Sequence, residues 1–267
     1  ADLLQSALNA SRAFFAQPLN DKQAVSRGRE QPWGYYDREL TKNLRDRKEI
    51  YDIGHVGQVP WPRAVAGFEA VSREFSAAAH ALGVRISLLI AQALELPVQS
   101  LLRLDHEHTS FTRLNHYPVE DILAHCPAPA AGPLGISHHT DAGVLTVLLQ
   151  DAVSGLQMQH KGEWIDVPAR PHTLTINLGD MFQVWANDRI RAPVHRVLAS
   201  TAAERYSIAY FLNPGTECVI APLMAAGCEA DARYAPIPWA EFRHLRALGD
   251  YGNYGEEVQI SHYRRQQ

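Results

Sequence analysis

In the segment Ser137–Asp151, SHHTDAGVLTVLLQD, two adjacent histidines and an aspartate precede an apolar run. The run from Val144 to Leu149 predicts a buried strand. In extended chain, side chains two positions apart lie on one face, so we expect His139 and Asp141 to point together and His138 to point away. An isolated His-x-Asp is more often a solvated pair at a strand end. A metal site therefore requires a third ligand.

His195 is the candidate third ligand, and it lies in the β-type run RAPVHRVLAS, 54 positions after Asp141. Two histidines and one carboxylate form the facial ligand set of non-haem Fe(II) oxygenases. Structural zinc would need a fourth ligand, usually cysteine, and no cysteine is near these residues in the sequence. A catalytic zinc site with these ligands is a weaker alternative, because such ligands usually lie on helices.

Arg205 and Ser207 are two positions apart in RYSIAYFL and are expected to share a face of a strand. A hairpin centred near Ser200 would place Arg205 beside His195 on the neighbouring strand. A guanidinium and a hydroxyl near a metal form a carboxylate receptor. A small diacid of the shape of 2-oxoglutarate would chelate the metal at one end and pair with Arg205 at the other. The alternative is a surface arginine at the start of a strand.

Composition indicates an ordinary globular protein of 267 residues, with 46% hydrophobic and 20% charged residues. The net charge of −4 gives no electrostatic argument for nucleic acid or an anionic membrane as partner. No apolar run approaches the ~20 residues of a membrane span, and the N-terminus does not resemble a signal peptide. Three widely spaced cysteines, Cys126, Cys218 and Cys228, argue against a disulfide framework and for a reducing cytoplasm. The oligomeric state is not indicated.

The chain divides into a helical front (residues 1–105), a strand-rich core (about 106–222) and a helical C-terminal segment (about 236–267), which we interpret as a single domain. Helices are expected over Leu3–Ala16, over 62–96 with an interruption at Gly83, and after Pro238. The polar segment 27–55 is expected to wrap the surface. Strands are predicted at about 110–117, 144–150, 155–160, 163–167, 173–178, 181–186, 192–199 and 205–212. The fold class is therefore α+β, with a jelly-roll core flanked by helices.

Several of these segments together resemble the Fe(II)/2-oxoglutarate-dependent oxygenases of the isopenicillin N synthase-like superfamily. They are HHTDAGVLTVLLQD, EWIDVPARPHTLTINLGDMFQVWAND, APVHRVL and ERYSIAYFLNP, and LNHYP resembles the Asn-x-Tyr-Pro element of that family. The resemblance covers nearly all of the chain and implies a double-stranded β-helix. It implies Fe(II), 2-oxoglutarate and O2 as cofactor and co-substrates, and oxidation of a small molecule at a C–H bond with release of succinate and CO2.

The resemblance also implies roles for seven residues. His139, Asp141 and His195 would bind iron, Arg205 and Ser207 would bind the far carboxylate of 2-oxoglutarate, and Tyr117 and Asn115 would also contact it. Members of the family usually begin with a strand-helix-strand segment that carries a Gly-His-Gly-like element. This sequence starts inside the helix that follows, so we expect either a trimmed sequence or a core edge covered in another way.

Other residues are weaker candidates. Arg113 shares a face with Asn115 and Tyr117 and would bind substrate or co-substrate, or form an internal ion pair. Substrate contacts are also proposed, with core packing or a solvated loop as the alternative, for Trp185, Asn187, Arg189, Arg191, Tyr35 and Tyr36. His116 is interpreted as structural, and His106-Glu107-His108 as a surface loop.

Two other functions fit the residues. One is an oxidase of the same fold that does not use 2-oxoglutarate, like isopenicillin N synthase. The other is a β-barrel binding module with a vestigial site, which the complete set of three ligands disfavours. The substrate, and the choice between hydroxylation, desaturation and ring closure, do not follow from the sequence.

Overall fold

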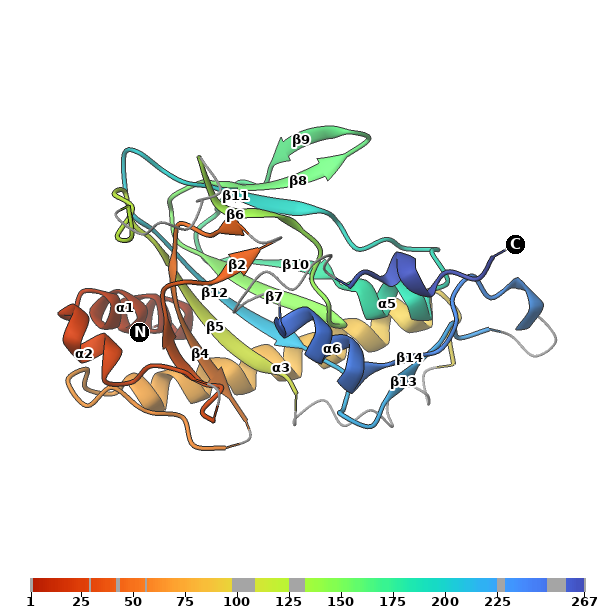
Figure 1. Cartoon of the computed structure of the whole chain (residues 1–267), viewed down its shortest axis with the longest axis horizontal. Coiled ribbons are helices and arrows are strands. Elements are labelled where there is room, and N and C mark those ends of the chain that lie inside the picture. Colours follow the sequence, from red (N-terminus) through yellow and green to blue (C-terminus); the bar gives the residue numbers. More distant parts are fainter. Residues whose placement is uncertain are drawn as a thin grey trace.

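The computed structural model describes residues 2–28, 30–41, 44–55, 57–97, 109–124, 133–224, 229–248 and 258–266. Two antiparallel sheets form its centre (Figure 1). The larger sheet has the strand order β1-β4-β5-β12-β7-β10, and the smaller has the order β6-β11-β8-β9. In chain order these strands are β1 (Gly34–Tyr36), β4 (Glu49–Gly54), β5 (Phe111–Tyr117), β6 (Leu134–His139), β7 (Leu145–Gln150), β8 (Leu156–His160), β9 (Glu163–Asp166), β10 (Leu174–Leu178), β11 (His195–Leu198) and β12 (Arg205–Leu212). This confirms the predicted jelly roll in an α+β fold.

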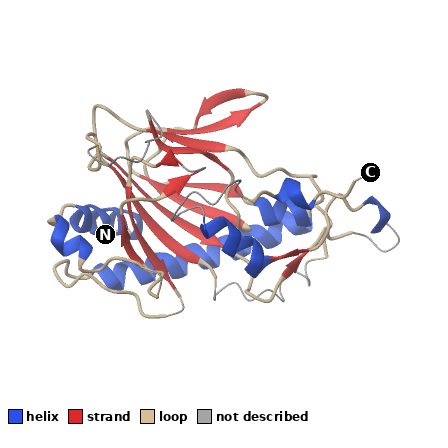
Figure 2. Cartoon of the chain, viewed as in Figure 1, coloured by secondary structure: helices blue, strands red, loops and turns tan. Residues whose placement is uncertain are grey.

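Helices cover the side of the large sheet that faces away from the small one (Figure 2). They are α1 (Leu3–Phe15), α2 (Leu19–Gln23) and α3 (Phe68–Ala93), and α3 packs on β7 and β12. Strand β7 alternates, so Leu145, Val147 and Leu149 join this core while Thr146 and Leu148 face the space between the sheets. Shorter elements complete the chain: β2 (Leu40–Thr41), β3 (Leu44–Arg45), α5 (Asp180–Trp185), β13 (Val219–Ile220), β14 (Ile237–Pro238), α6 (Trp239–Leu248) and 3-10 turns at Glu229–Asp231 and Ile260–Tyr263.

The polar segment 27–55 does not wrap the surface as expected. Its strand β4 has six buried residues and pairs with β5 inside the large sheet. Charged residues are tolerated there because they pair with one another: Glu49 binds Lys22 at 2.7 Å, and Asp52 binds Arg27 at 2.6 Å. The prediction failed because charge density alone does not distinguish a solvated segment from one whose charges are matched inside the fold.

Two further differences concern secondary structure. Residues 181–186 were predicted as a strand but lie in α5, where Met181, Phe182, Val184 and Trp185 are all buried. A short apolar run buried on all sides has no periodicity that separates helix from strand. The sequence analysis also did not predict β6, the strand that ends at His139.

Gly83 does not interrupt the long helix. It lies inside α3, and a Cβ atom there would be 3.4 Å from Leu145 Cδ2 and 3.5 Å from Leu212 Cδ2. We expect Gly83→Ala to fit and to raise the free energy of unfolding by up to about 1 kcal/mol, since glycine inside a helix costs conformational entropy. Gly83→Leu should lower it by roughly 1–3 kcal/mol through overpacking. Urea unfolding of both variants checks this, and equal effects of the two would contradict the packing described.

The expectation that no apolar run approaches the length of a membrane span was wrong: α3 is long and apolar enough to cross a membrane, judged on length and composition alone. Its contact with β7 and β12 explains the apolar composition without a membrane. We therefore interpret α3 as a core helix of this fold.

Candidate metal and co-substrate site

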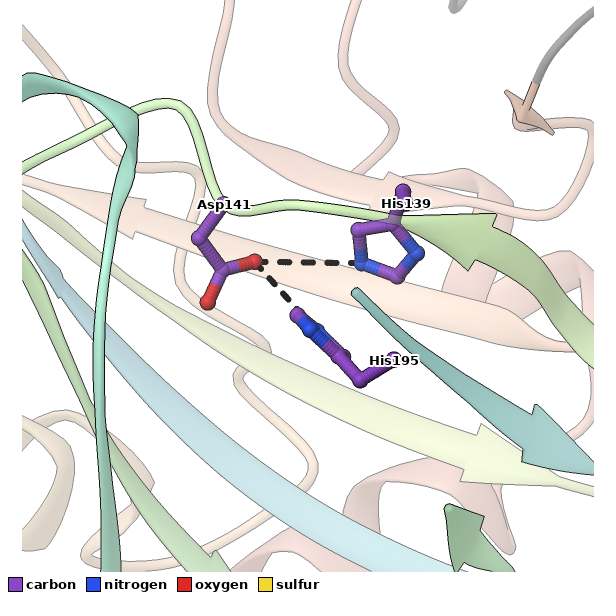
Figure 3. Close-up of side chains that lie close together, drawn as sticks. All are labelled: His139, Asp141 and His195. Carbon is purple, nitrogen blue, oxygen red and sulfur yellow. Dashed lines mark ion pairs between the residues drawn. The ribbon is translucent and has the colours of Figure 1, made fainter. Parts of the chain in front are cut away.

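The three predicted metal ligands meet in the space between the two sheets (Figure 3). His139 ends β6 and His195 begins β11, and these residues are direct partners in the small sheet. Asp141 follows in the loop that leads from β6 to β7. Asp141 Oδ1 lies 3.8 Å from His139 Nε2 and 3.6 Å from His195 Nε2. Among the described residues this is the one group of three His, Cys, Asp or Glu whose ligand atoms lie within 4.8 Å of one another.

Hydrogen bonds set the orientation of each ligand. The Nδ1 atoms of His139 and His195 lie 2.8 Å from Ser137 O and 3.0 Å from Pro193 O, so each Nδ1–H donates to a backbone carbonyl. The lone pair of each imidazole is then on Nε2, which faces Asp141. Asp141 Oδ2 accepts hydrogen bonds from Thr146 Oγ1 and Asn177 Nδ2. Its Oδ1 is thereby left to face the two histidines.

The protonation states also suit metal binding. Burial, and then the neighbouring His195, lower the pKa of His139 to about 3, so the imidazole is neutral near pH 7. Burial alone would raise the pKa of Asp141, but His195, His139 and the two hydrogen bonds outweigh it and hold the pKa below its usual value. A carboxylate and two imidazoles on one side of a cavity fit Fe(II) with open coordination positions.

His138 takes no part in this cluster. Its side chain is exposed, and its ring lies 6.5 Å from that of Trp164 on β9. Two adjacent histidines therefore point to opposite sides of the small sheet, as the spacing predicted.

Arg205 has the surroundings expected of a carboxylate receptor. Its side chain is fully buried at the start of β12, and Nη2 donates to Gln150 Oε1 at 2.9 Å. Its Nε atom is buried without a hydrogen-bond partner, and among the described residues no carboxylate pairs with this guanidinium. A buried cation without a counter-ion is costly, so the site fits an anion such as the far carboxylate of 2-oxoglutarate.

The other predicted co-substrate residues surround Arg205. Tyr117 is its partner across β5 and β12, and Ser207 pairs with Asn115 two residues further along. The Arg205 guanidinium lies 4.9 Å from the centre of the Tyr117 ring. Asn115 Oδ1 is buried without a hydrogen-bond partner. All four residues line one cavity with the three metal ligands.

The route of the chain from His195 to Arg205 differs from the expected hairpin. β11 pairs with β6 and β8 in the small sheet, whereas β12 pairs with β5 and β7 in the large sheet. Both edges of each strand are thus occupied, and residues 199–204 cross from one sheet to the other. Arg205 and His195 face the same cavity from opposite walls.

Comparison with known proteins agrees with this geometry. Residues 108–214 match the model of the 2OG-Fe(II) oxygenase superfamily. Gibberellin 2-beta-dioxygenase 5 of Oryza sativa subsp. japonica is 29% identical over 98% of this chain and 76% of its own length. Proline hydroxylase buaE of Petromyces alliaceus is 30% identical over 90% of this chain and 83% of its own length. The chain belongs to the 2OG-Fe(II) oxygenase superfamily. The crystal structure of JOX2 in complex with 2OG, Fe and JA superposes with a TM-score of 0.80 at 28% identity, covering 94% of this chain and 75% of that one.

The cavity of this oxygenase has a volume of about 650 Å³ and extends well beyond the metal ligands and Arg205. Two of the weaker candidates, Arg113 and Arg191, line it. Arg113 also forms ion pairs with Asp52 at 2.7 Å and Glu39 at 2.9 Å, so the internal ion pair considered for it is present.

The remaining candidates lie elsewhere. Trp185 is buried in the main core, and Asn187 bonds the backbone of Asp231 and Arg233. Neither is part of the cavity wall, and the same holds for Arg189, Tyr35 and Tyr36. Tyr35 bonds Glu49, Tyr36 lies under Arg27, and Arg189 bonds the carbonyl of Leu94. His116 bonds Glu49 in a structural network, and residues 106–108 lie outside the described residues.

The sequence analysis missed several residues of the wall. Thr146 and Asn177 each donate a hydrogen bond to Asp141. In the sequence each is a polar residue within an apolar strand, and this was the available signal. Arg27, Glu39, Lys48 and Asp52 come from the segment expected on the surface. Arg243 of α6, an amphipathic C-terminal helix, gave no signal in the sequence.

Proposed function

We propose that this oxygenase oxidises a small organic molecule that occupies the cavity together with 2-oxoglutarate. The observation that carries the proposal is the joint placement of the His139, Asp141 and His195 cluster and the unpaired Arg205 in one cavity. Relatives named for gibberellin and proline support a small-molecule substrate.

Bound Fe(II), with 2-oxoglutarate and O2, supplies an oxidant strong enough to break a C–H bond while 2-oxoglutarate is decarboxylated to succinate and CO2. The protein holds and orients the groups. His139, Asp141 and His195 would hold the metal, and Arg205 and Ser207 would bind the far carboxylate of 2-oxoglutarate. Leu148, Leu156 and Val197 line the same cavity and limit the access of water.

Replacing Arg205 tests the co-substrate assignment. We expect Arg205→Met to raise the dissociation constant of 2-oxoglutarate by about 10²–10³-fold, because the variant loses a desolvated charge pair. Iron affinity without 2-oxoglutarate should not change. Anaerobic titration of the Fe(II) protein, followed by the visible metal-to-ligand charge-transfer band, measures both.

Arg196→Met is the matched control, because Arg196 bonds Gln157 and stacks on Trp164 outside the cavity wall. Iron binding by wild type with no band and no release of CO2 from labelled 2-oxoglutarate would instead favour an oxidase that does not use 2-oxoglutarate. No iron binding would favour a binding module.

We also propose that the chain forms one oxygenase domain that acts in the cytoplasm without a nucleic-acid or membrane partner. The absence of a disulfide pattern in the sequence supports a reducing compartment, and the net charge of −4 gives no reason for polyanion binding. Cys218 forms no disulfide among the described residues, while Cys126 and Cys228 lie outside them. Fractionation of cells with an antibody to the chain tests the location.

A further inference from the structure

The cavity has a co-substrate end and an opposite, aromatic end. Alternate residues of β12, from Arg205 to Phe211, line it. Arg205 pairs with Tyr117 at one end, and Phe211 pairs with Phe111 at the other. Six residues of strand correspond to about 20 Å. The cavity therefore has room beyond 2-oxoglutarate for a substrate on the side of the two phenylalanines.

Helix α6 lines the same cavity, next to its aromatic end. Trp239 Nε1 donates to Thr109 Oγ1 at 3.2 Å, next to the start of β5. Arg246 binds Asp180 at 2.5 Å, and the backbone N–H of Asp180 donates to the carbonyl of Asp141 at 2.8 Å. The helix thus extends from the start of β5 to the loop that carries a metal ligand. One face of it, at positions 239, 243, 246 and 247, lines the cavity.

The charges in the cavity wall do not balance. The described wall contains seven basic side chains and three acidic ones. Arg27, Lys48 and Arg113 share Glu39 and Asp52, and Arg246 has Asp180. Asp141 is a candidate metal ligand, so its charge is matched by the metal ion. Arg205 is expected to pair with the far carboxylate of 2-oxoglutarate. Two basic residues remain, the exposed Arg191 and the partly buried Arg243.

The guanidinium of Arg243 has no hydrogen-bond or ion-pair partner among the described residues. Burial lowers the pKa of Arg243, and the charge of Asp52 opposes this only in part. A cation that is partly removed from water in this way is stabilised when an anion approaches it. Its five donors in a planar fork match a carboxylate.

We propose that Arg243 binds a carboxylate of the substrate, so that the substrate of this oxygenase is a small carboxylic acid with an apolar body. The proposal rests on the proposed function, since it concerns the substrate side of the same cavity. Trp33, Phe111 and Phe211 line the wall and provide the surface for the apolar body. An acid held at α6 presents its carbon atoms towards the metal ligands and leaves Arg205 to 2-oxoglutarate.

Three acids and their amides serve as probes: phenylacetate, 3-phenylpropionate and cyclohexylacetate, each paired with its primary amide. Calorimetric titrations use the anaerobic protein loaded with Fe(II) and saturating 2-oxoglutarate, so that Arg205 is occupied. We expect wild type to bind at least one acid about 10–100-fold more tightly than its amide, as a charged hydrogen bond implies. Arg243→Met should abolish this preference.

The preference for acid over amide separates recognition of charge from a structural effect, because a misfolded cavity would weaken both probes alike. Arg63→Met is the matched control, since Arg63 is exposed and outside the cavity wall, and it should keep the preference. If no acid binds more tightly than its amide, or the preference survives in Arg243→Met, the proposal is wrong. The charge-transfer band of wild type is recorded first, and its absence would contradict the proposed function instead.

Discussion

His139→Ala is expected to abolish iron binding and turnover, whereas His138→Ala should leave both nearly unchanged. The two residues are adjacent in the chain, but only His139 faces Asp141 and His195. Loss of a direct ligand leaves two donors on the metal. The fall in iron affinity should therefore exceed the roughly 10–100-fold that removal of an outer hydrogen-bond partner costs.

Anaerobic equilibrium dialysis with Fe(II), and 2-oxoglutarate consumption under air, measure the two effects. His138→Ala controls for the loss of an imidazole from the same strand, because the His138 side chain is exposed and its ring lies near that of Trp164. Thr146→Val is an intermediate case, since it removes one hydrogen bond to Asp141 Oδ2 and leaves all three ligands. If His139→Ala keeps wild-type activity, or if His138→Ala loses it, the ligand assignment is wrong.

The site was predictable from the sequence where local spacing determines direction. Two pairs illustrate this: His139 with Asp141, and Arg205 with Ser207. The members of each pair are two residues apart, and in extended chain such side chains point to the same face. His195 was identified by its chemistry and its β-type surroundings. Which strands pair with which is a non-local property, so residues 199–204 were interpreted as a hairpin although they connect two sheets.

The missed part of the cavity wall consists of charged residues with distant partners. Arg113 is 61 positions from Asp52 and 74 from Glu39, and each of these residues alone resembles a surface charge. The free energy of burying them depends on partners that only the folded chain brings together. The same holds for Arg243, which a helical pattern alone places on a solvated face.

Glu39→Gln is expected to lower the free energy of unfolding by about 3–5 kcal/mol, the cost of removing one member of a buried ion pair. Glu39 is buried, and its carboxylate binds Lys48 at 2.6 Å, Arg113 at 2.9 Å and Arg27 at 3.2 Å. Glutamine fills the same space but carries no charge. Lys48, Arg113 and Arg27 then have only Asp52 and Asp46 as anionic partners. Urea unfolding followed by circular dichroism measures the change.

Glu69→Gln is the matched control. Glu69 pairs with Arg73 at 2.8 Å on the exposed face of α3, and its loss should cost less than about 1 kcal/mol. Equal effects of the two substitutions would show that the buried network adds no more than a surface pair.

The effect of Glu39→Gln should also depend on pH. Burial alone would raise the pKa of Glu39, but Arg113, Lys48 and Arg27 outweigh it and hold the pKa well below the ordinary value of 4.5. A group whose pKa is lower in the folded state stabilises fully above its unfolded pKa and less as the pH falls through the folded pKa. The difference between wild type and Glu39→Gln should therefore be largest near neutral pH and shrink below about pH 4. A difference that stays constant from pH 7 to pH 3 would mean that the carboxylate charge of Glu39 is not what stabilises the wall of the cavity.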